Sequence, residues 1–516
     1  MLKTNYYTPP SALDLIVFEK LVAPEHYLRR VKGLISFQVV REIIAGCYSA
    51  TMGRPADDPV LMLKLSFLQF QYDLSDHDVL EQAKVNIAFR FFLDLGLESK
   101  LPVPSLLSQF RTRLGQANFR KVFEEILRQI RAHGLVKDRL RLKDATHVLA
   151  NIAVPRTIEL VAQTRAQLLA AARPWAAAEV AAHEARAAEV RQATADLKAE
   201  QRLLQRVEHL RQIVEWADAK QLLLTGGADL GLDAEQQKQF ERALELAHKV
   251  LADREPKAQD KLLSLTDTEA RVGKHGGYYT GYALDVSLDA DSEIICALEV
   301  LPANGAEAGN AQALLEAEEA AQGNDVQSLS LDSIGFQGAV LRALTAEGGP
   351  QVEVFVPPYT HESNHPELYQ PADFQLNATK DELTCPGGAQ TRTRYRASHH
   401  QGYQFNFSKQ QCAPCPLRDQ CLKPANKSGR TVVRNDYEAE YAAARARAQT
   451  AQYKEVRKQH PRIERKLADL IRWHGGRRVR YRGRLRVKIQ YFLTAVVVNF
   501  KRLVKLYYQP LAVQPI

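Results

Sequence analysis

The periodicity of the apolar residues changes at Arg139, and this change constrains the fold more than any other feature. Up to about Gly134, apolar residues recur at helical spacing, as in PVLMLKLSFLQFQYDLSDHDVLEQA, where Ser75 is a candidate helix N-cap. From Arg139, the stretch RLRLKDATHVLANIAV alternates apolar and polar residues, which predicts a strand carrying Asp144. A helical first domain, either a DNA-binding helix-turn-helix variant or a structural bundle, is therefore followed by a domain with a sheet.

Strand and helix patterns alternate through the middle of the chain. The runs between Gly276 and Asn304 are joined by a turn at Asp289–Ser292 and predict a hairpin. A helix at Asn310–Gln322 and a strand ending at Asp332 are expected next. The helix GAVLRALTA and the strand VEVFVPP then follow. This order predicts an α/β core.

The stretch from about Glu159 to Lys261 interrupts this core. It is rich in Ala, Glu, Gln, Arg and Leu, and is broken near Pro174 and at Gly226–Gly227. We expect a helical hairpin or bundle inserted between the first and second strands. Dimerisation, clamping of a DNA strand and a spacer role all remain open for it.

Three carboxylates are candidates for a shared metal site. Asp144 and Asp332 lie on or at the end of apolar strands, where a carboxylate is costly to bury unless it is solvated, paired or bound to a cation. Glu464 lies in the first turns of a predicted helix. Three such oxygen donors suit two Mg²⁺ or Mn²⁺ ions roughly 4 Å apart, an arrangement that supports phosphoryl transfer. The alternatives are turn or capping roles for the aspartates and an ion pair of Glu464 with Arg465, Lys466 or Lys458.

The last 47 residues, from Leu470, contain no Asp or Glu but eleven Lys and Arg. The whole chain has a formal charge of +9, so the rest of the chain is slightly negative. A basic segment with interleaved aromatic residues is typical of a surface that tracks phosphates, so DNA is the expected partner. The alternative is a basic segment that pairs with acidic groups of the same chain. The candidate DNA-contacting residues are Arg472, Arg477, Arg478, Arg480, Arg482 and Arg484.

Four of the six cysteines crowd between Cys385 and Cys421. Cys385, Cys412, Cys415 and Cys421 have the arrangement Cys-x26-Cys-x2-Cys-x5-Cys. This spacing predicts a structural Zn²⁺ site; the alternative is a loop of reduced thiols, and His399, His400 or Asn406 could alter the ligand set. Tyr491–Phe500, the longest apolar run, has about half the length of a membrane helix. We therefore expect a soluble protein with no membrane partner, located in the cytoplasm and associated with the nucleoid.

Several stretches resemble the DDE transposases of bacterial insertion sequences, specifically the branch with an InsH-type helical N-terminal domain. They are GRPADDPVLMLKL at Gly53–Leu65, KDATHVLAN around Asp144, DTEARVGKHGGYYTGYALDVSLDADSEIICALEVLPAN, LSLDSIGF around Asp332, and PRIERKLADLIRWHGGRRVRYRG around Glu464. The resemblance covers nearly the whole chain, and its motifs occur in the family's order.

The resemblance implies an α/β fold with an RNase H-like catalytic core, and it implies Asp144, Asp332 and Glu464 as the triad for two Mg²⁺ or Mn²⁺ ions. The implied enzyme is a DNA transposase that acts on terminal inverted repeats and target DNA, as a homodimer or higher oligomer. Arg271, Lys274 and His275 lie in a family-like motif and are candidates for contacting the transposon end, with local turn chemistry as the alternative.

The expected organisation is a helical DNA-binding domain (1–136), the catalytic core (137–157 and 262–360), a helical insertion (158–261), a cysteine module that binds zinc (361–430), and C-terminal helices with the catalytic Glu and the basic segment (431–516).

The sequence also departs from the family pattern. Many relatives place a Lys seven residues after the Glu and an Arg four residues before it; here Ile471 and His460 occupy these positions, so Arg472 or Arg457 is the candidate phosphate contact. The turn after Asp332 lacks the Lys that many relatives have. Two alternative functions therefore stay open: an inactive copy that acts as a zinc-bearing DNA-binding repressor, and an RNase H-like nuclease without strand transfer.

Overall fold

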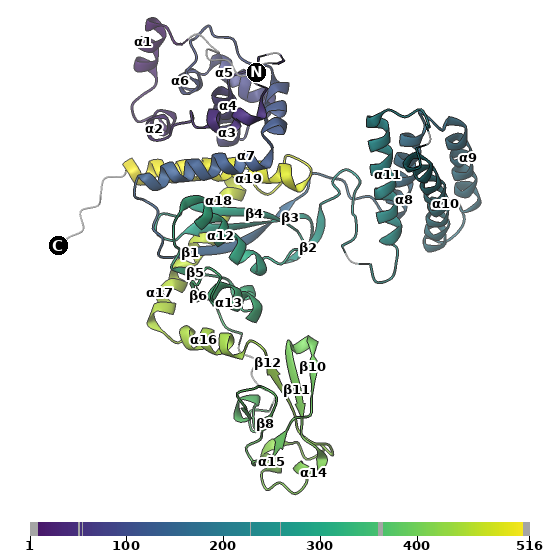
Figure 1. Cartoon of the computed structure of the whole chain (residues 1–516). Helices are drawn as coiled ribbons and strands as arrows, with labels where there is room; N and C mark the ends of the chain where they lie inside the picture. Colours follow the sequence, from purple (N-terminus) through teal and green to yellow (C-terminus); the bar gives the residue numbers. More distant parts are fainter. Residues whose placement is uncertain are drawn as a thin grey trace, which may run out of the picture.

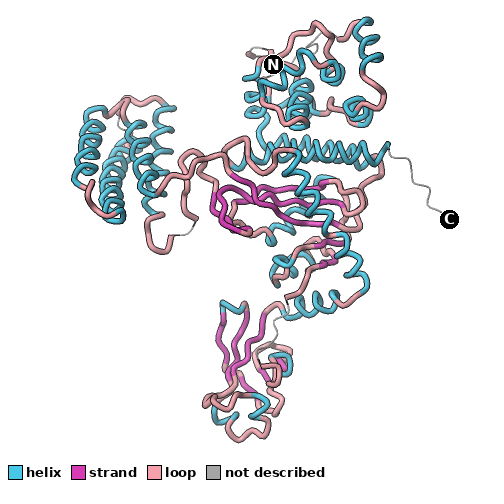
Figure 2. Tube along the Cα trace, turned by 180° about the vertical axis from the view of Figure 1, so that it is seen from behind, coloured by secondary structure: helices cyan, strands magenta, loops and turns pink. Residues whose placement is uncertain are grey.

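The computed structural model describes residues 9–49, 52–53, 55–227, 229–258, 260–359 and 365–508; Arg54, within the Gly53–Leu65 stretch, lies outside them. A mixed sheet occupies the centre of the molecule (Figure 1). A helical N-terminal domain, a helical bundle and a small β-rich module surround it, and the view from behind shows the same separation (Figure 2). The chain is therefore a mixed α/β protein with a helical N-terminal region.

The N-terminal domain is built around helix α4, in which every residue from Pro59 to Phe70 is buried. The predicted cap is confirmed, because the Ser75 hydroxyl accepts a hydrogen bond of 3.0 Å from the Asp78 N–H at the start of α5. The helices are α1 (Ala12–Leu21), α2 (Tyr27–Leu34), α3 (Val40–Ile44), α4 (Pro59–Gln71), α5 (Asp76–Val85), α6 (Ile87–Leu93) and α7 (Pro104–Ala132).

The N-terminal domain is attached to the core through the C-terminal helix α19 (Arg484–Tyr508), which lies beside α7 (Figure 1). Phe500 of α19 contacts Phe37 and Phe67, with ring centroids 5.9 and 5.2 Å apart. Every residue of Tyr491–Phe500 is buried, so this apolar run packs into a core. The two ends of the sequence thus share one hydrophobic core with the sheet.

The central sheet mixes antiparallel and parallel strands. The long strand β3 pairs antiparallel with β1 on one side, and with β2 and β4 on the other; β1, β5 and β6 are parallel neighbours. This mixed sheet is consistent with a DDE or RNase H-like core. The strands are β1 (Arg141–Leu149), β2 (Arg271–His275), β3 (Gly277–Asp289), β4 (Ile295–Pro302), β5 (Ser328–Ser330) and β6 (Glu353–Phe355).

Helices cover both faces of this sheet. Arg141 of β1 bonds to Glu318 of α12 (Ala311–Gln322). Asp144 lies three positions further along the strand, so its side chain points to the opposite face. Helix α18 (Pro461–Trp473) packs against β1. The remaining helices of this part are α13 (Gly338–Thr345), α16 (Glu438–Ala448) and α17 (Ala451–Gln459).

The stretch between β1 and β2 forms a bundle with its own hydrophobic core, and the bundle stands to the side of the sheet (Figure 1). Its helices end near the predicted breaks, at Ala172 and Thr225. Trp175 and Trp216 stack inside it with ring centroids 6.2 Å apart. The helices are α8 (Thr157–Ala172), α9 (Ala177–Ala193), α10 (Ala199–Thr225) and α11 (Ala234–Ala252).

The β-rich module contains two small three-stranded sheets and lies beyond α16 (Figure 1). Its core is formed by Phe374, Leu383, Phe405, Phe407 and Val432. The elements are β7 (Gln375–Leu376), β8 (Leu383–Thr384), β9 (Gln390–Thr391), β10 (Arg394–Ala397), β11 (Gly402–Asn406), α14 (Lys409–Cys412), α15 (Arg418–Cys421) and β12 (Thr431–Asn435).

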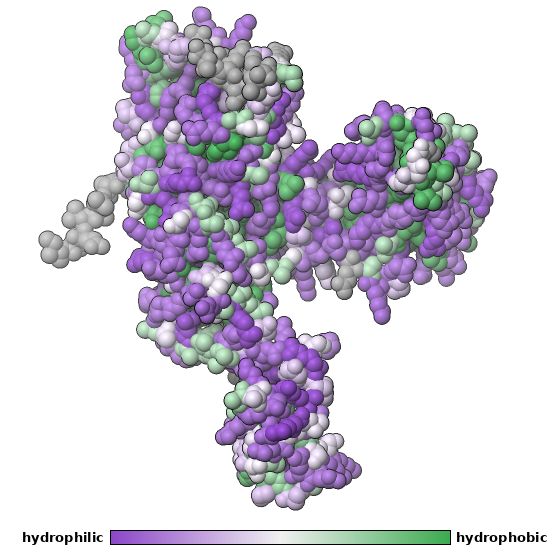
Figure 3. Space-filling model, in the orientation of Figure 1, coloured by the Kyte–Doolittle hydropathy of each residue, from purple (hydrophilic) through white to green (hydrophobic). Residues whose placement is uncertain are grey.

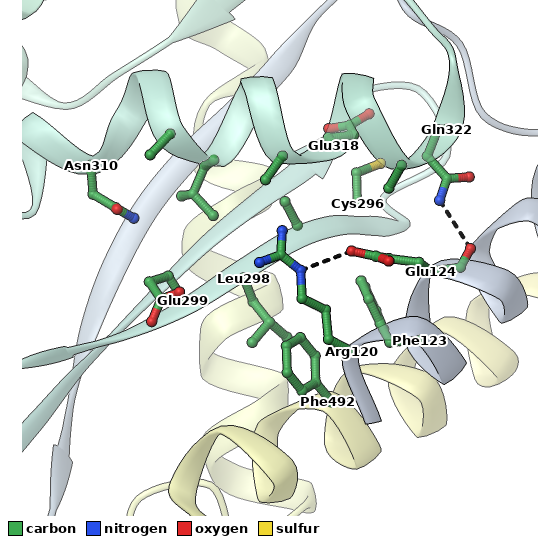
Figure 4. Close-up of a pocket in the computed structure, with 15 residues that line it drawn as sticks. Arg120, Phe123, Glu124, Cys296, Leu298, Glu299, Asn310, Glu318, Gln322 and Phe492 are labelled. Atoms are coloured by element: carbon green, nitrogen blue, oxygen red, sulfur yellow. Dashed lines mark hydrogen bonds and ion pairs between the residues drawn. The ribbon is translucent and has the colours of Figure 1, made fainter. Parts of the chain in front are cut away.

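A cavity of about 150 Å³ lies where α7, α12, β4 and α19 meet (Figure 4). Arg120 and Glu124 form an ion pair of 2.8 Å along α7, and the Gln322 amide donates to the Glu124 carbonyl at 2.9 Å. The cavity contains none of Asp144, Asp332 and Glu464. It therefore belongs to the junction between the N-terminal domain and the core.

The surface is mostly hydrophilic, with an apolar patch over α1 (Figure 3). Leu13, Leu15, Ile16 and Leu21 of this helix are between 53% and 69% exposed. None of the helices in the described ranges is long and apolar enough to span a membrane.

Candidate active site

Asp144 and Asp332 lie at the same level of neighbouring parallel strands. Arg141 of β1 pairs with Leu329 of β5, and Leu142 pairs with Ser330. Continuing this register past the end of β5 places Asp144 opposite Asp332, at the strand spacing of roughly 4.8 Å. Asp332 itself has an extended backbone and directly precedes the 3-10 turn Ser333–Gly335. Residues in register on parallel strands face the same side, so both carboxylates face the side that α18 covers.

Glu464 lies in the first turn of α18. The helix begins at Pro461, and its buried residues Ile463, Leu467 and Leu470 anchor it, as the apolar spacing predicted. The alternative ion pairs of Glu464 are not formed: Lys458 pairs with Glu455 and Lys466 with Glu293.

Asp332 and Glu464 lie near enough to Asp144 to influence its protonation. Burial and the negative charges of Asp332 and Glu464 raise the pKa of Asp144 to about 7, although the Ala145 N–H and Lys143 lower it. The Asp144 carboxylate accepts a hydrogen bond of 2.8 Å from the Ala145 N–H. Within the described ranges, none of the three carboxylates forms an ion pair. The cations near them, Lys143 and Arg457, therefore act at a distance and not through a direct ion pair.

Arg457 of α17 lies beside this site. Its guanidinium donates to the Leu331 carbonyl at 2.6 Å and to the Ser330 hydroxyl at 3.1 Å, immediately before Asp332. Burial lowers the pKa of Arg457, and the nearby carboxylates of Asp332 and Glu464 oppose that effect. Of the two arginines considered for a phosphate contact, Arg457 is at the site, whereas Arg472 is exposed near the end of α18.

His460 also contacts the end of β5. It is 2% exposed, and its Nδ1 lies 3.1 Å from the Ser330 hydroxyl. Burial and the charge of Arg457 lower its pKa to about 4, so the ring is neutral near pH 7. Ser330 is the shared contact of both side chains, and no local sequence pattern links α17 to a strand end so far away in sequence.

The donor set fits divalent cations, because carboxylate oxygen donors are the ligands that Mg²⁺ and Mn²⁺ prefer. In the conformation of the described residues, however, no group of three or more His, Cys, Asp or Glu side chains is arranged to hold a metal ion. The three carboxylates lie near one another without forming a coordination shell.

The candidate DNA-contacting residues Arg271, Lys274 and His275 lie on β2, which pairs with β3. Arg271 forms an ion pair with Asp260 and donates to the carbonyls of Thr268 and Ala270. Lys274 and His275 are exposed at the end of the strand. Of these three, Lys274 and His275 are the ones open to a ligand.

The basic segment after α18 is not a free surface along its whole length. Arg480 pairs with Asp73 and donates to the Leu74 carbonyl at 2.6 Å. Arg484 lies 3.6 Å from Glu269. Arg477 donates to the His147 carbonyl and Arg482 to the Asn151 carbonyl. These contacts tie the segment to the N-terminal domain and to the end of β1.

Among the predicted arginines of this segment, Arg472 and Arg478 are exposed and have no side-chain partner in the described ranges.

The four clustered cysteines line one cavity of about 130 Å³. A side chain at Gly387 would come within 3.0 Å of the Cys415 sulfur and 3.7 Å of the Cys385 sulfur, so glycine leaves room for them. Burial raises the pKa of Cys421, and the other three thiols add to this effect. His399 and His400 lie in a turn after β10 and do not line the cavity. This donor set fits Zn²⁺, although the thiols, like the carboxylates, form no closed metal shell as arranged.

Comparisons with known proteins match two parts of the chain. Residues 16–113 match the family described as "Transposase domain (DUF772)", and residues 384–504 match "Transposase DDE domain". The second match includes Glu464 and the four cysteines, whereas Asp144 and Asp332 lie between the two matches.

A curated relative, the uncharacterized protein ORF8 of the nfe locus of Rhizobium meliloti, is 30% identical over 99 residues. The aligned part is 19% of this chain and 47% of the relative, so the chain spans about half the length of that protein. No solved structure matches the chain. The two matches flank the sequence of the mixed sheet, and they show that the chain carries a transposase DUF772 domain and a transposase DDE domain.

Proposed function

We propose that the protein catalyses metal-dependent DNA strand cleavage and strand transfer for an insertion sequence, with Asp144, Asp332 and Glu464 as the catalytic, metal-binding triad. The observation that supports this most directly is the convergence of three carboxylates without a direct ion pair. Two of them come from parallel strands in register and the third from the helix packed on β1. A DDE transposase requires such a set of oxygen donors from separate elements.

Asp144, Asp332 and Glu464 would hold two Mg²⁺ or Mn²⁺ ions. When bound, the ions supply activation of the attacking oxygen and stabilisation of the leaving 3′ oxygen. The side chains of the protein hold the geometry: β1 and β5 fix the two aspartates, and the apolar face of α18 fixes Glu464. Arg457 holds the backbone just before Asp332 and places a positive charge near the site, where a DNA phosphate is the expected neighbour.

DNA binding is assigned to several surfaces. The helical N-terminal domain is the proposed reader of the terminal inverted repeats. Lys274, His275, Arg472 and Arg478 are the side chains in the predicted DNA-binding set that remain open to phosphates. Two element ends have to be held together for strand transfer, so we propose a homodimer or higher oligomer in the DNA complex. The exposed apolar residues of α1 are a candidate contact between copies.

The cysteine module is proposed to bind a structural Zn²⁺ through Cys385, Cys412, Cys415 and Cys421. The four sulfurs line one cavity, and the module has only a small hydrophobic core of its own. A closed site of four thiolates would add folding free energy and take no part in the reaction.

A strand-transfer assay tests the proposal. Labelled DNA that carries the element's own ends is incubated with the native protein and with Glu464→Gln, in Mg²⁺, in Mn²⁺ and in EDTA. Metal-dependent cleaved and joined products that disappear in the variant are expected. Cleavage without joining would instead indicate an RNase H-like nuclease. End binding without cleavage by the native protein would indicate an inactive, repressor-like copy.

A further inference from the structure

The helical insertion contains a cluster of arginines in which Arg165 is influenced by two like charges and by one carboxylate, Glu184. Arg165 of α8, Arg191 of α9 and Arg206 of α10 come from three different helices, and their charges act on one another. Arg165 is only 9% exposed, yet its guanidinium has neither a hydrogen bond nor an ion pair with the described residues. The nitrogen atoms of this guanidinium are not fully shielded from solvent, so their donors remain open to a ligand.

The acidic residues nearby are already paired elsewhere. Glu184 pairs with Arg173, and Glu189 pairs with Arg186 at 2.9 Å. The polar contact of Arg206 within this cluster is a long one, 3.5 Å to the hydroxyl of Thr194. The Nε atoms of Arg202 and Arg206 are buried and have no hydrogen-bond partner in the described part of the chain.

His209 adds a second unpartnered polar group. It is 3% exposed, and both of its ring nitrogens are buried without a hydrogen-bond partner among the described residues. Burial, followed by the charges of Arg165 and other neighbouring cations, lowers its pKa to about 4, so the ring is neutral near pH 7. A neutral imidazole carries one N–H that is free to donate.

We propose that the helical insertion binds a phosphate group between α8, α9 and α10, with Arg165, Arg191 and Arg206 as its charged ligands and His209 as a neutral donor. A guanidinium has several donors in a planar fork that matches phosphate oxygens, and a bound dianion would compensate the clustered positive charge. The phosphate comes either from a DNA strand or from a free anion. The bundle stands to the side of the sheet, so this site is separate from the three carboxylates (Figure 1).

The first arm of the test measures inorganic phosphate by isothermal titration calorimetry. The full-length native protein is compared with Arg165→Met at constant ionic strength, in EDTA, so that catalysis plays no part. The matched control is Arg211→Met, which removes an exposed arginine of α10 that pairs with Glu208 at 2.7 Å. If the source is a free anion, the native protein and the control bind phosphate, and Arg165→Met weakens that binding at least tenfold.

The second arm measures a labelled duplex of random sequence by fluorescence anisotropy over a range of salt concentrations. If the source is DNA, Arg165→Met lowers the slope of log affinity against log salt by about one, while Arg211→Met leaves it unchanged. Circular dichroism verifies folding, and Arg206→Met replaces Arg165→Met if the latter does not fold. The proposal would be overturned if Arg165→Met and Arg206→Met bound both phosphate and DNA as well as the control Arg211→Met does. Neither result affects the strand-transfer assay, because that assay tests the role of Glu464 and not the phosphate site of the insertion.

Discussion

Asp144, inside β1, and Asp332, just after β5, have the same 188-residue separation as the paired residues Arg141 and Leu329, so the register of the two parallel strands continues to this pair. The helix that carries Glu464 packs on the same strand β1. Burial of Asp144 and the charges of the other two carboxylates then raise its pKa to about 7. Sheet register, more than any local sequence motif, therefore brings the proposed metal ligands together.

Replacing Asp332 by alanine should abolish cleavage of element-end DNA while end binding stays within a factor of about two, because the residue is proposed to hold metal and not DNA. Cleavage is measured by gel analysis of labelled DNA, and binding by anisotropy in EDTA. Asp325→Ala is the matched control. Asp325 precedes β5, whereas Asp332 follows it, so this variant should cleave normally. Loss of binding together with cleavage would place Asp332 in the DNA interface instead.

The stability of the metal-free protein should depend on the protonation of Asp144. Its pKa is about 7 in the folded chain and 3.8 ordinarily, so the folded state binds more protons between these values. The free energy of unfolding should therefore fall as the pH rises from about 4 to about 7. Above pH 7, Asp144 should cause no further change. Each pKa unit corresponds to about 1.4 kcal/mol. Asp144→Asn should be more stable than the native protein above pH 7 by a few kcal/mol at most.

Urea unfolding in EDTA at pH 5, 6, 7 and 8 tests this expectation. The advantage of Asp144→Asn should grow up to about pH 7 and then level off. It should shrink when saturating Mg²⁺ is added, because the native protein gains a ligand that the variant binds poorly. A difference that is independent of pH would contradict the environment described for Asp144.

The sequence predicted those parts of the fold that depend on local patterns. Helical spacing and the cap at Ser75, the turn at Asp289–Ser292 and the breaks near Pro174 and Gly226 all have short-range signals. Asp144 and Asp332 could be found because a carboxylate stands out in an apolar strand. These features need only a few neighbouring residues to be recognised.

The sequence could not predict contacts that depend on packing between distant elements. Arg480 looked free to bind DNA, yet its partner Asp73 is 407 positions away. Arg457 bonds to the Leu331 carbonyl, 126 positions away, through the docking of α17 against β5. Arg165 lies in a helix rich in alanine, where an arginine ordinarily indicates a solvated face. In each case the three-dimensional surroundings, and not the local pattern, determine what the side chain does.

Arg457 is expected to position the site. Arg457→Met leaves the Leu331 carbonyl without its donor, which should cost about 1–3 kcal/mol of folding free energy and should shift the backbone next to Asp332. We expect slower cleavage and a higher Mg²⁺ concentration at half-maximal rate, with partial recovery in Arg457→Lys. Lys458→Met, which removes an exposed neighbour paired with Glu455, is the control. An unchanged Mg²⁺ dependence would show that Arg457 acts only on stability.

The cysteine module should contain one Zn²⁺ per chain. Atomic emission of the purified protein measures this ratio directly. Cys415→Ser should lose the zinc and lower the melting temperature of the module, because the metal would add folding free energy. Cys47→Ser, a cysteine of the N-terminal domain, should retain it. Zinc content that does not respond to Cys415→Ser would rule out these ligands.

Arg478 and Arg480 should separate DNA binding from folding within the same basic run. Arg478 is exposed without a partner, so Arg478→Met should reduce the salt slope of DNA binding by about one and leave the melting temperature unchanged. Arg480 ties the run to Asp73 and to the Leu74 carbonyl. Asp73 is 56% exposed, so solvent screens the pair, and Arg480→Met should cost only about 1 kcal/mol with little change in the salt slope. Anisotropy against salt and thermal melting, measured on both variants, test the contrast. Equal effects of the two substitutions on the salt slope would mean that DNA displaces Asp73 from Arg480.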